Sequence, residues 1–185
     1  MGQGEPLLNF DNLIKSIKIF REQFQIGARR ITVSTCGLIP QINKLAELDF
    51  QSTLAISLHA PNQEKRKDIM PVANKYKFDD LINCLKKYAE TTGRRVTVEY
   101  VLMRGINDSV EDAKQLAISI SKLKSNVNLI VYNQNEKSEY KKPTKEAIQK
   151  FKYILEASGK KVTIRLERGA DIDAACGQLS AKMKK

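Results

Sequence analysis

At 185 residues the chain is long enough for one sizeable hydrophobic core, which predicts a single domain over residues 1–185. Its 42% hydrophobic and 29% charged residues argue against a disordered chain. The sequence contains no run of about 18 apolar residues, so it predicts no membrane span. A net charge of +11 favours a polyanionic partner such as a nucleic acid, and a merely basic, soluble surface is the alternative.

Helices and strands are predicted to alternate along the chain. In chain order, the periodicity of apolar residues predicts a helix at 13–20, a strand at 31–35, a helix at 42–46, a strand at 53–58, a helix at 78–89, a strand at 96–103, a helix at 110–120, a strand at 127–131, a helix at 147–155 and a strand at 161–166. Ser109 and Thr144 are predicted N-caps, and Gly93 and Gly159 fall just past helices, where a left-handed residue is favourable. Such alternation predicts an α/β fold with a parallel sheet and helical crossovers.

In a parallel α/β sheet the functional loops follow the carboxyl ends of the strands. Here those ends are polar, and most contain Gly or Pro: residues 4–6, 34–37, 57–61, 104–108 and 132–133. They offer hydroxyls, amides, one carboxylate and one imidazole at one end of the sheet. The sequence therefore predicts a site for a polar small molecule such as a nucleoside or an amino acid.

The three cysteines, Cys36, Cys84 and Cys176, are far apart and odd in number. This pattern argues against a disulfide framework and is typical of a reducing compartment. The first residues lack the basic and apolar parts of a secretory signal, so a cytoplasmic protein is expected. Without further context Cys84 is a packing residue, and Cys36 is a small buried one.

Six segments in order carry a resemblance: GEPLLN (4–9), RRITVSTCG (29–37), LAISLHAPN (54–62), VEYVLMRGINDS (98–109), NLIVYN (128–133) and DIDAACGQL (171–179). Together they resemble the radical S-adenosylmethionine RNA adenine-C2 methyltransferases of the RlmN type. The resemblance covers nearly the whole chain. It implies a partial (β/α) TIM-like barrel that lacks its N-terminal part, and a dual-specificity enzyme acting on 23S rRNA and tRNA.

The resemblance also implies a role for individual residues. Gly4 and Glu5 match positions that meet the amino group of S-adenosylmethionine, and a carboxylate suits an ammonium group. Further positions that match cofactor contacts are Ser34, Ser57, Leu58, His59 and Asn133. Taken alone, a histidine at a strand end is as often a structural hydrogen-bonding group.

Cys176 matches the cysteine that first accepts a methyl group and then delivers it to adenine. Attack of a thiolate on a sulfonium methyl group is an ordinary nucleophilic displacement. The family then uses a 5′-deoxyadenosyl radical to activate the methylated thioether, and a partner cysteine resolves the adduct. Residues of about 169–180 are expected to form a mobile loop that carries Cys176.

One part of the family pattern is missing from this sequence. The C-x-x-x-C-x-x-C motif that holds a 4Fe-4S cluster does not occur, and the isolated Cys36 and Cys84 do not replace it. We therefore expect no metal ligand in this chain, expect Met1 to lie inside a longer protein, and expect the chain alone to be inactive. The family implies an electron donor such as flavodoxin and a monomeric full-length enzyme.

Two alternatives stay open. The sister class that methylates adenine C8 and confers antibiotic resistance shares Cys176 and most strand ends, although GEPLLN and Glu99-Tyr100 favour the C2 class. A non-catalytic basic RNA-binding domain is supported by charge alone, and the aromatic motifs of common single-strand binders are missing.

Overall fold

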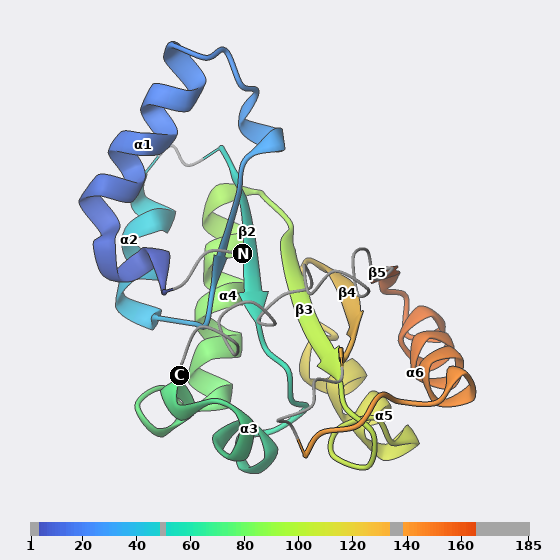
Figure 1. Ribbon diagram of the computed structural model, residues 1–185. Helices are drawn as coiled ribbons and strands as arrows, with labels where there is room; N and C mark the ends of the chain where they lie inside the picture. The colour runs from blue at the N-terminus through green and yellow to red at the C-terminus, as the bar shows by residue number, and fades with distance from the viewer. Residues whose placement is uncertain (1–3, 49–50, 134–138, 166–185) are drawn as a thin grey trace, which may run out of the picture.

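Five strands form one parallel sheet in the computed structural model, which describes residues 4–48, 51–133 and 139–165 (Figure 1). The strands are β1 (Thr32–Thr35), β2 (Thr53–Ser57), β3 (Val96–Leu102), β4 (Ser125–Val131) and β5 (Lys161–Arg165). All five predicted strands are confirmed. The one substantial difference is β4, which begins two residues earlier than its apolar pattern indicated.

The strands lie in the order β1-β2-β3-β4-β5, so each pairs with its neighbour in the chain. All four pairings are parallel, with Thr32 beside Thr53 and Asn126 beside Lys161 as examples of the register. Because parallel crossovers are right-handed, an order without reversal puts every crossover on the same face of the sheet. This winding is that of a barrel segment and not of a doubly wound sheet, in agreement with the expected partial barrel.

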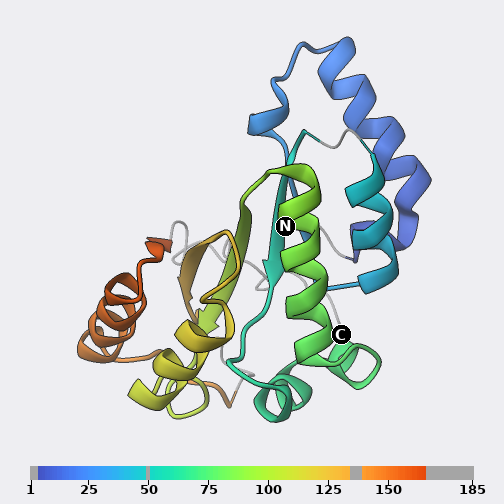
Figure 2. The ribbon, with the colours of Figure 1, turned by 180° about the vertical axis from the view of Figure 1, so that it is seen from behind.

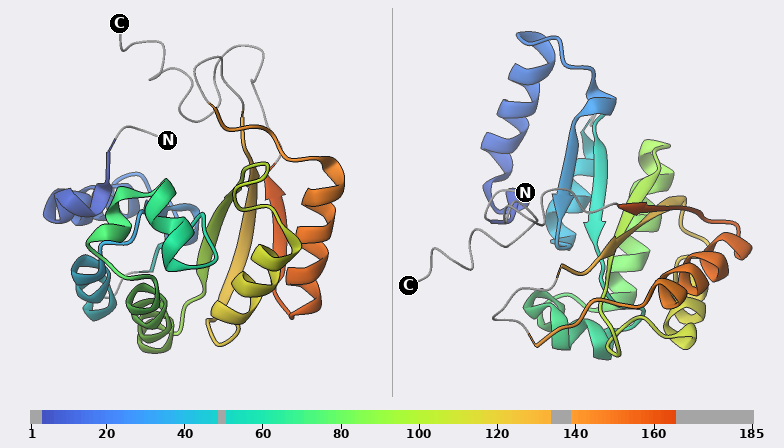
Figure 3. Two further views of the ribbon diagram at one scale, coloured as in Figure 1. Left: turned by 90° about the horizontal axis from the view of Figure 1, so that it is seen from below. Right: turned by 45° about the vertical axis from the view of Figure 1, so that its right-hand side comes forward.

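The helices cover one face of this sheet. They are η1 (Pro6–Asn9), α1 (Phe10–Glu22), η2 (Ala28–Arg30), α2 (Ile39–Glu47), α3 (Gln63–Ile69), η3 (Pro71–Asn74), α4 (Phe78–Thr92), α5 (Val110–Ser119) and α6 (Lys145–Ala157). Seen from behind in Figure 2, α4 lies in front of β2 and β3. Figure 3 shows α1 and α2 beside one end of the row of strands and α6 beside the other. In the described ranges no helix combines the length and apolarity that a membrane crossing requires.

The two faces of the sheet differ in polarity because side chains alternate along a strand. On β3, Val96, Val98, Tyr100 and Leu102 are buried against the helices. The register aligns mostly polar residues on the opposite face. One row holds Ser34, the apolar Ala55, Thr97, Asn126 and Lys161, and the next holds Ser57, Glu99, Asn128 and Thr163. The face without helices therefore offers hydrogen-bonding groups across all five strands.

The predicted helix ends are confirmed. Ser109 and Asp112 form a capping box at the start of α5, and the Thr144 hydroxyl accepts the Ala147 N–H at the start of α6. Gly93 ends α4 in the left-handed conformation at φ 67°. These local signals fix where the crossovers begin and end, and so where the loops at the strand ends emerge.

Candidate cofactor site

The loops that follow the strands meet at one edge of the sheet, because parallel strands all end on the same side. We call this the carboxyl edge; it comprises residues 36–37, 58–59, 103–108 and 132–133, together with residues 4–5 that precede η1. It holds five of the seven predicted cofactor residues: Gly4, Glu5, Leu58, His59 and Asn133. The other two, Ser34 in β1 and Ser57 at the end of β2, lie within strands and face the open side of the sheet.

Glu5 links two loops at this edge. One carboxylate oxygen accepts the Leu7 N–H at 3.0 Å, which caps η1, and the other accepts the Cys36 N–H at 2.7 Å, just beyond β1. Gly4 precedes it with φ 117°, a backbone region that favours glycine, although no atom would crowd a side chain there. The carboxylate is thus held in place by backbone donors and keeps lone pairs for a further donor such as an ammonium group.

Glu99 of β3 lies in the middle of this site. The Ser34 hydroxyl donates to its carboxylate at 2.9 Å, and the register places it beside Ser57 on the neighbouring strand. Two of the predicted cofactor residues, Ser34 and Ser57, are therefore grouped around one carboxylate on the open face. Glu99 alternates along β3 with Val98 and Tyr100, which face the helices, and this alternation puts it on the open face.

Leu58 and His59 follow β2 and serve different purposes. Leu58 is fully buried, and its side chain packs in the core. Its N–H donates to the Glu99 carbonyl at 3.0 Å. His59 adopts a left-handed conformation with φ 56°, which is uncommon for residues other than glycine.

The imidazole of His59 is fixed by β3. The Val101 N–H donates to Nδ1 at 3.2 Å, which leaves the ring proton of the neutral form on Nε2. Burial, with a further contribution from the nearby Arg66 cation, lowers the pKa of His59 from 6.5 to about 4. His59 is therefore a neutral side chain at pH 7 whose donor is Nε2–H. The structural and the cofactor-binding interpretations of this histidine are compatible.

Two buried side chains at this edge were not predicted from the sequence. Arg66 of α3 is fully buried. Its Nη2 donates to the Cys36 carbonyl at 2.7 Å and to the Ser57 carbonyl at 3.5 Å. Burial lowers the pKa of its guanidinium to about 10. Within the described ranges its Nε and Nη1 atoms have no hydrogen-bond partner. The second, Asn107, is fully buried and contacts both the β2 and β3 ends.

Asn133 lies just beyond β4, on the far side of β3 from His59. Its Nδ2 is buried, and among the residues that the structure describes it has no hydrogen-bond partner. A buried amide donor without an acceptor is unfavourable unless a ligand or water supplies one. From β1 to β4 the sheet spans three interstrand spacings, about 14 Å, so a ligand that touches both Glu5 and Asn133 must be elongated.

The described cysteines are poor nucleophiles. Burial, with the neighbouring Glu5 carboxylate, raises the pKa of Cys36 to about 12, and burial raises that of Cys84 to about 11. Both therefore fit the packing role predicted for them. Cys176 and the expected loop at about 169–180 lie outside the described residues.

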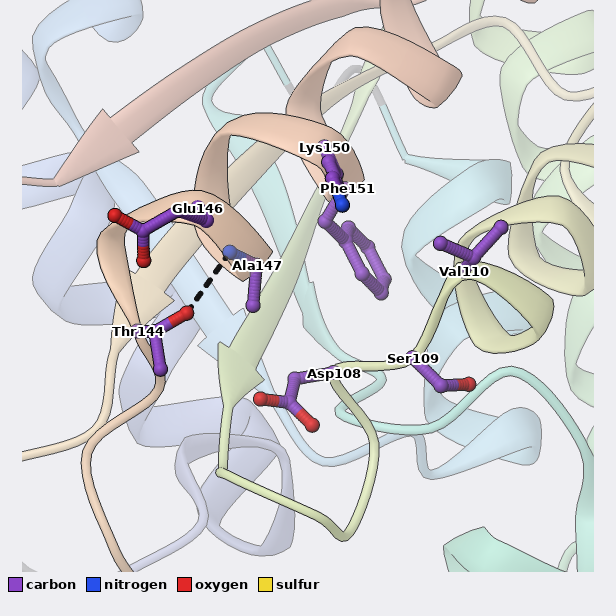
Figure 4. A pocket seen from close by; sticks show the side chains of 8 residues that line it. All are labelled: Asp108, Ser109, Val110, Thr144, Glu146, Ala147, Lys150 and Phe151. Atoms are coloured by element: carbon purple, nitrogen blue, oxygen red, sulfur yellow. Dashed lines mark hydrogen bonds between the residues drawn. The ribbon is translucent and has the colours of Figure 1, made fainter.

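A separate pocket of about 270 Å³ lies between the N-terminal ends of α5 and α6 (Figure 4). It is lined by Asp108, Ser109, Val110, Thr144, Glu146, Ala147, Lys150 and Phe151. None of these is a predicted cofactor residue. The hydroxyl of Thr144 is engaged by the Ala147 N–H, as the dashed line in Figure 4 shows.

Three pairs of adjacent basic residues lie away from the carboxyl edge. Arg29-Arg30, Arg94-Arg95 and Lys160-Lys161 come immediately before, or begin, strands β1, β3 and β5, so they lie at the opposite edge. Part of this charge has a structural use: Lys124 donates to the Gly93 carbonyl and Lys160 to the Leu123 carbonyl. Lys141-Lys142 lies near the carboxyl edge, where the Lys141 carbonyl accepts the Arg104 N–H.

The resemblance implies two cofactors, S-adenosylmethionine and a 4Fe-4S cluster, and the residues at the carboxyl edge fit the first. A fixed carboxylate, an imidazole donor and a buried unpartnered amide are a suitable set for an elongated molecule with an ammonium group and a nucleoside, as in S-adenosylmethionine. A 4Fe-4S cluster does not fit: the described residues contain no group of three His, Cys, Asp or Glu side chains able to hold a metal ion. The sequence also lacks the three-cysteine spacing.

The chain is similar to known radical SAM proteins. The family model for the radical SAM superfamily matches residues 1–117. A probable dual-specificity RNA methyltransferase RlmN from Lachnospira eligens is 49% identical over 98% of this chain and 53% of its own length. Its counterpart from Clostridium perfringens strain SM101 is 49% identical over 97% of this chain and 52% of its own length. The chain thus spans about half the length of these curated relatives.

Solved structures show the same fold. The crystal structure of a radical SAM methyltransferase from Sphaerobacter thermophilus has a TM-score of 0.92 and 45% identity, covering 96% of this chain and 53% of that one. A domain of a pyruvate-formate lyase-activating enzyme from Bacteroides vulgatus shares the fold at a TM-score of 0.70 and 22% identity, covering 90% of this chain and 97% of that one. The match over residues 1–117, together with this likeness of fold, shows that the chain belongs to the radical SAM superfamily.

Proposed function

We propose that this chain is the cofactor-binding portion of an RlmN-type RNA methyltransferase that methylates C2 of adenine in 23S rRNA and tRNA. Support comes from relatives named as dual-specificity RNA methyltransferases at 49% identity. Further support comes from the set of polar groups at the carboxyl edge. The observation that carries the cofactor part is the buried Nδ2 of Asn133, which has no hydrogen-bond partner among the described residues.

In this proposal Glu5 binds the ammonium group of S-adenosylmethionine, held ready by the Leu7 and Cys36 N–H groups. Gly4, Ser34, Ser57 and the backbone of Leu58 complete the inner part of the site. His59 donates through Nε2–H, and Asn133 donates its amide N–H to the nucleoside end. When bound, the cofactor supplies an activated methyl group.

Cys176 is the proposed acceptor of that methyl group. As a thiolate its sulfur forms a bond to the methyl carbon while the bond from that carbon to the sulfonium sulfur breaks. The two described cysteines are unsuited to this role because their raised pKa values keep them as thiols near neutral pH. Cys176 is thus the remaining candidate among the three cysteines of the sequence.

The wider setting is part of the proposal. Because the sequence contains no C-x-x-x-C-x-x-C motif, we expect the 185-residue chain alone not to methylate RNA. The complete enzyme is proposed to be a cytoplasmic monomer that supplies the cluster ligands from other residues and receives electrons from a donor such as flavodoxin.

Calorimetric titration of the chain with S-adenosylmethionine tests the cofactor part. Asn133→Ala should weaken binding about tenfold, since a buried hydrogen bond to a ligand contributes about 1.4 kcal/mol. Asn83→Ala, at an exposed position of α4, is the matched control and should leave the affinity unchanged. An Asn133→Ala chain that binds as tightly as the parent would contradict the assignment.

The reaction is tested in a chimera that joins this chain to the part of the Lachnospira eligens relative that it does not cover. Mass spectrometry of digested RNA should show 2-methyladenosine, and Cys176→Ala should abolish it. Formation of 8-methyladenosine would instead support the sister class. RNA binding without methylation, unchanged by Cys176→Ala, would support the non-catalytic alternative.

A further inference from the structure

Asn107 is a buried hub between two loops of the carboxyl edge. The residue is fully buried in the turn after β3. Its Nδ2 donates to the His59 carbonyl and to the Val101 carbonyl, each at 2.7 Å, and its Oδ1 accepts the Met103 N–H at 2.7 Å. Both N–H groups of the amide are therefore used, and its orientation is fixed by its partners.

The main chain of Asn107 is held as firmly as its side chain. Its carbonyl accepts the Tyr100 hydroxyl at 2.9 Å, in a fully buried position. Tyr100 in turn packs on Phe151 of α6, with ring centroids 5.1 Å apart. The main chain of Asn107 is thus held by β3 and, through Tyr100, by the helical layer, while its side chain contacts the residue that follows β2.

The two carbonyls that Asn107 binds belong to the pair of residues that fixes the imidazole. His59 has a strained left-handed backbone, which persists only when the surroundings determine it. Val101 supplies the N–H that meets Nδ1 of His59. Beyond Ser57 the β2–β3 ladder has ended, so the imidazole provides the acceptor that the next strand residue would otherwise supply.

We propose that Asn107 is a positioning residue of the cofactor site: it holds His59 and Val101 together so that the imidazole keeps a single tautomer, with its proton on Nε2. The inference rests on the proposed function only where it assigns His59 to the cofactor. An aspartate cannot replace Asn107, because its carboxylate would face two carbonyl oxygens with no N–H to offer them.

The test uses the uniformly ¹⁵N-labelled 185-residue chain, in which the imidazole signals come from His59 alone because it is the single histidine of the sequence. In the parent chain the ¹⁵N spectrum should show a protonated Nε2 and an unprotonated Nδ1 at pH 7, with slow hydrogen exchange at the Val101 amide. Asn107→Asp should give a mixture of the two tautomers of His59. The Val101 amide should exchange its hydrogen about tenfold faster than in the parent chain. Asn62→Asp is the control, because an aspartate caps α3 as well as the native asparagine does.

A folded Asn107→Asp chain with the parent tautomer and parent exchange rate overturns the proposal. If that variant does not fold, Tyr100→Phe decides, since it removes only the hydroxyl that anchors the Asn107 main chain. It should shift the tautomer ratio in the same direction by a smaller amount, and an unshifted ratio overturns the proposal. Adding S-adenosylmethionine separates the two hypotheses: a locked tautomer whose signals do not respond to the cofactor refutes the cofactor role of His59 and leaves the positioning role intact.

Discussion

Acidification from pH 7 to pH 4 is expected to destabilise the chain through His59. In the folded chain its pKa is about 4, below the ordinary 6.5, because the ring is buried and the Arg66 cation lies nearby. Between these pH values the unfolded chain binds a proton at this residue and the folded chain does not. Stability that is fully present above pH 6.5 is therefore lost progressively as the pH falls toward 4.

The size of this effect follows from the two pKa values. One pKa unit corresponds to about 1.4 kcal/mol, so the fall from 6.5 to about 4 gives a loss of about 3 kcal/mol. A typical domain is stable by about 5–15 kcal/mol, so this one residue accounts for a sizeable share.

Urea unfolding at pH 7, 6, 5 and 4 measures the loss, with His59→Asn as the reference. Asparagine tolerates the left-handed backbone and has no group that titrates in this range. Carboxylates that titrate near pH 4 are common to both chains and cancel in the difference. The difference in unfolding free energy between the two chains should change by about 3 kcal/mol over this range. Parallel curves would refute the assignment of a buried, neutral His59.

Three further predictions concern stability and reactivity. Asp112→Ala should lower the free energy of unfolding by about 2 kcal/mol in urea, because it removes the capping box of α5 and the partner of a lysine; a loss under about 0.5 kcal/mol would contradict this. Gly37→Ala should lower the melting temperature more than Gly93→Ala, since both positions need a positive φ but only the first would place a Cβ 3.0 Å from a leucine; equal losses would count against the crowding. Cys36 and Cys84 should react slowly with iodoacetamide at pH 8 and quickly in urea, as mass spectrometry can follow, because burial raises the pKa of both thiols; fast labelling of the folded chain would oppose it.

The sheet could be predicted because its signals are local. Strand β3, for example, alternates buried and less buried positions over Val96–Leu102, and glycine or serine marks the ends of the helices beside it. The start of β4 was missed because Ser125 and Asn126 are polar. Asn126 faces the open side of the sheet, where a polar residue is tolerated, so hydropathy gave no sign of a strand there.

The parts of the site that could not be predicted depend on contacts distant in sequence. Helix α3 has the sequence QEKRKDI, with no apolar stripe, so neither the helix nor the burial of Arg66 is evident from periodicity. The sequence around Asn107 indicates a turn, but its partners His59 and Val101 are 48 and 6 residues away and meet it only in the folded sheet. The left-handed backbone of His59 likewise has no local signal.

The strand order also has a consequence for how the chain folds. Each strand pairs with the strand made just before it, and paired residues are 21 (Thr32 and Thr53) to 42 (Ala55 and Thr97) positions apart. Because no strand pairs with a segment that is far away along the chain, each pairing closes a loop of moderate length and has a modest entropy cost. During synthesis the sheet can therefore grow by one strand and one helix at a time, and the binding edge can take shape loop by loop as the ribosome releases the chain.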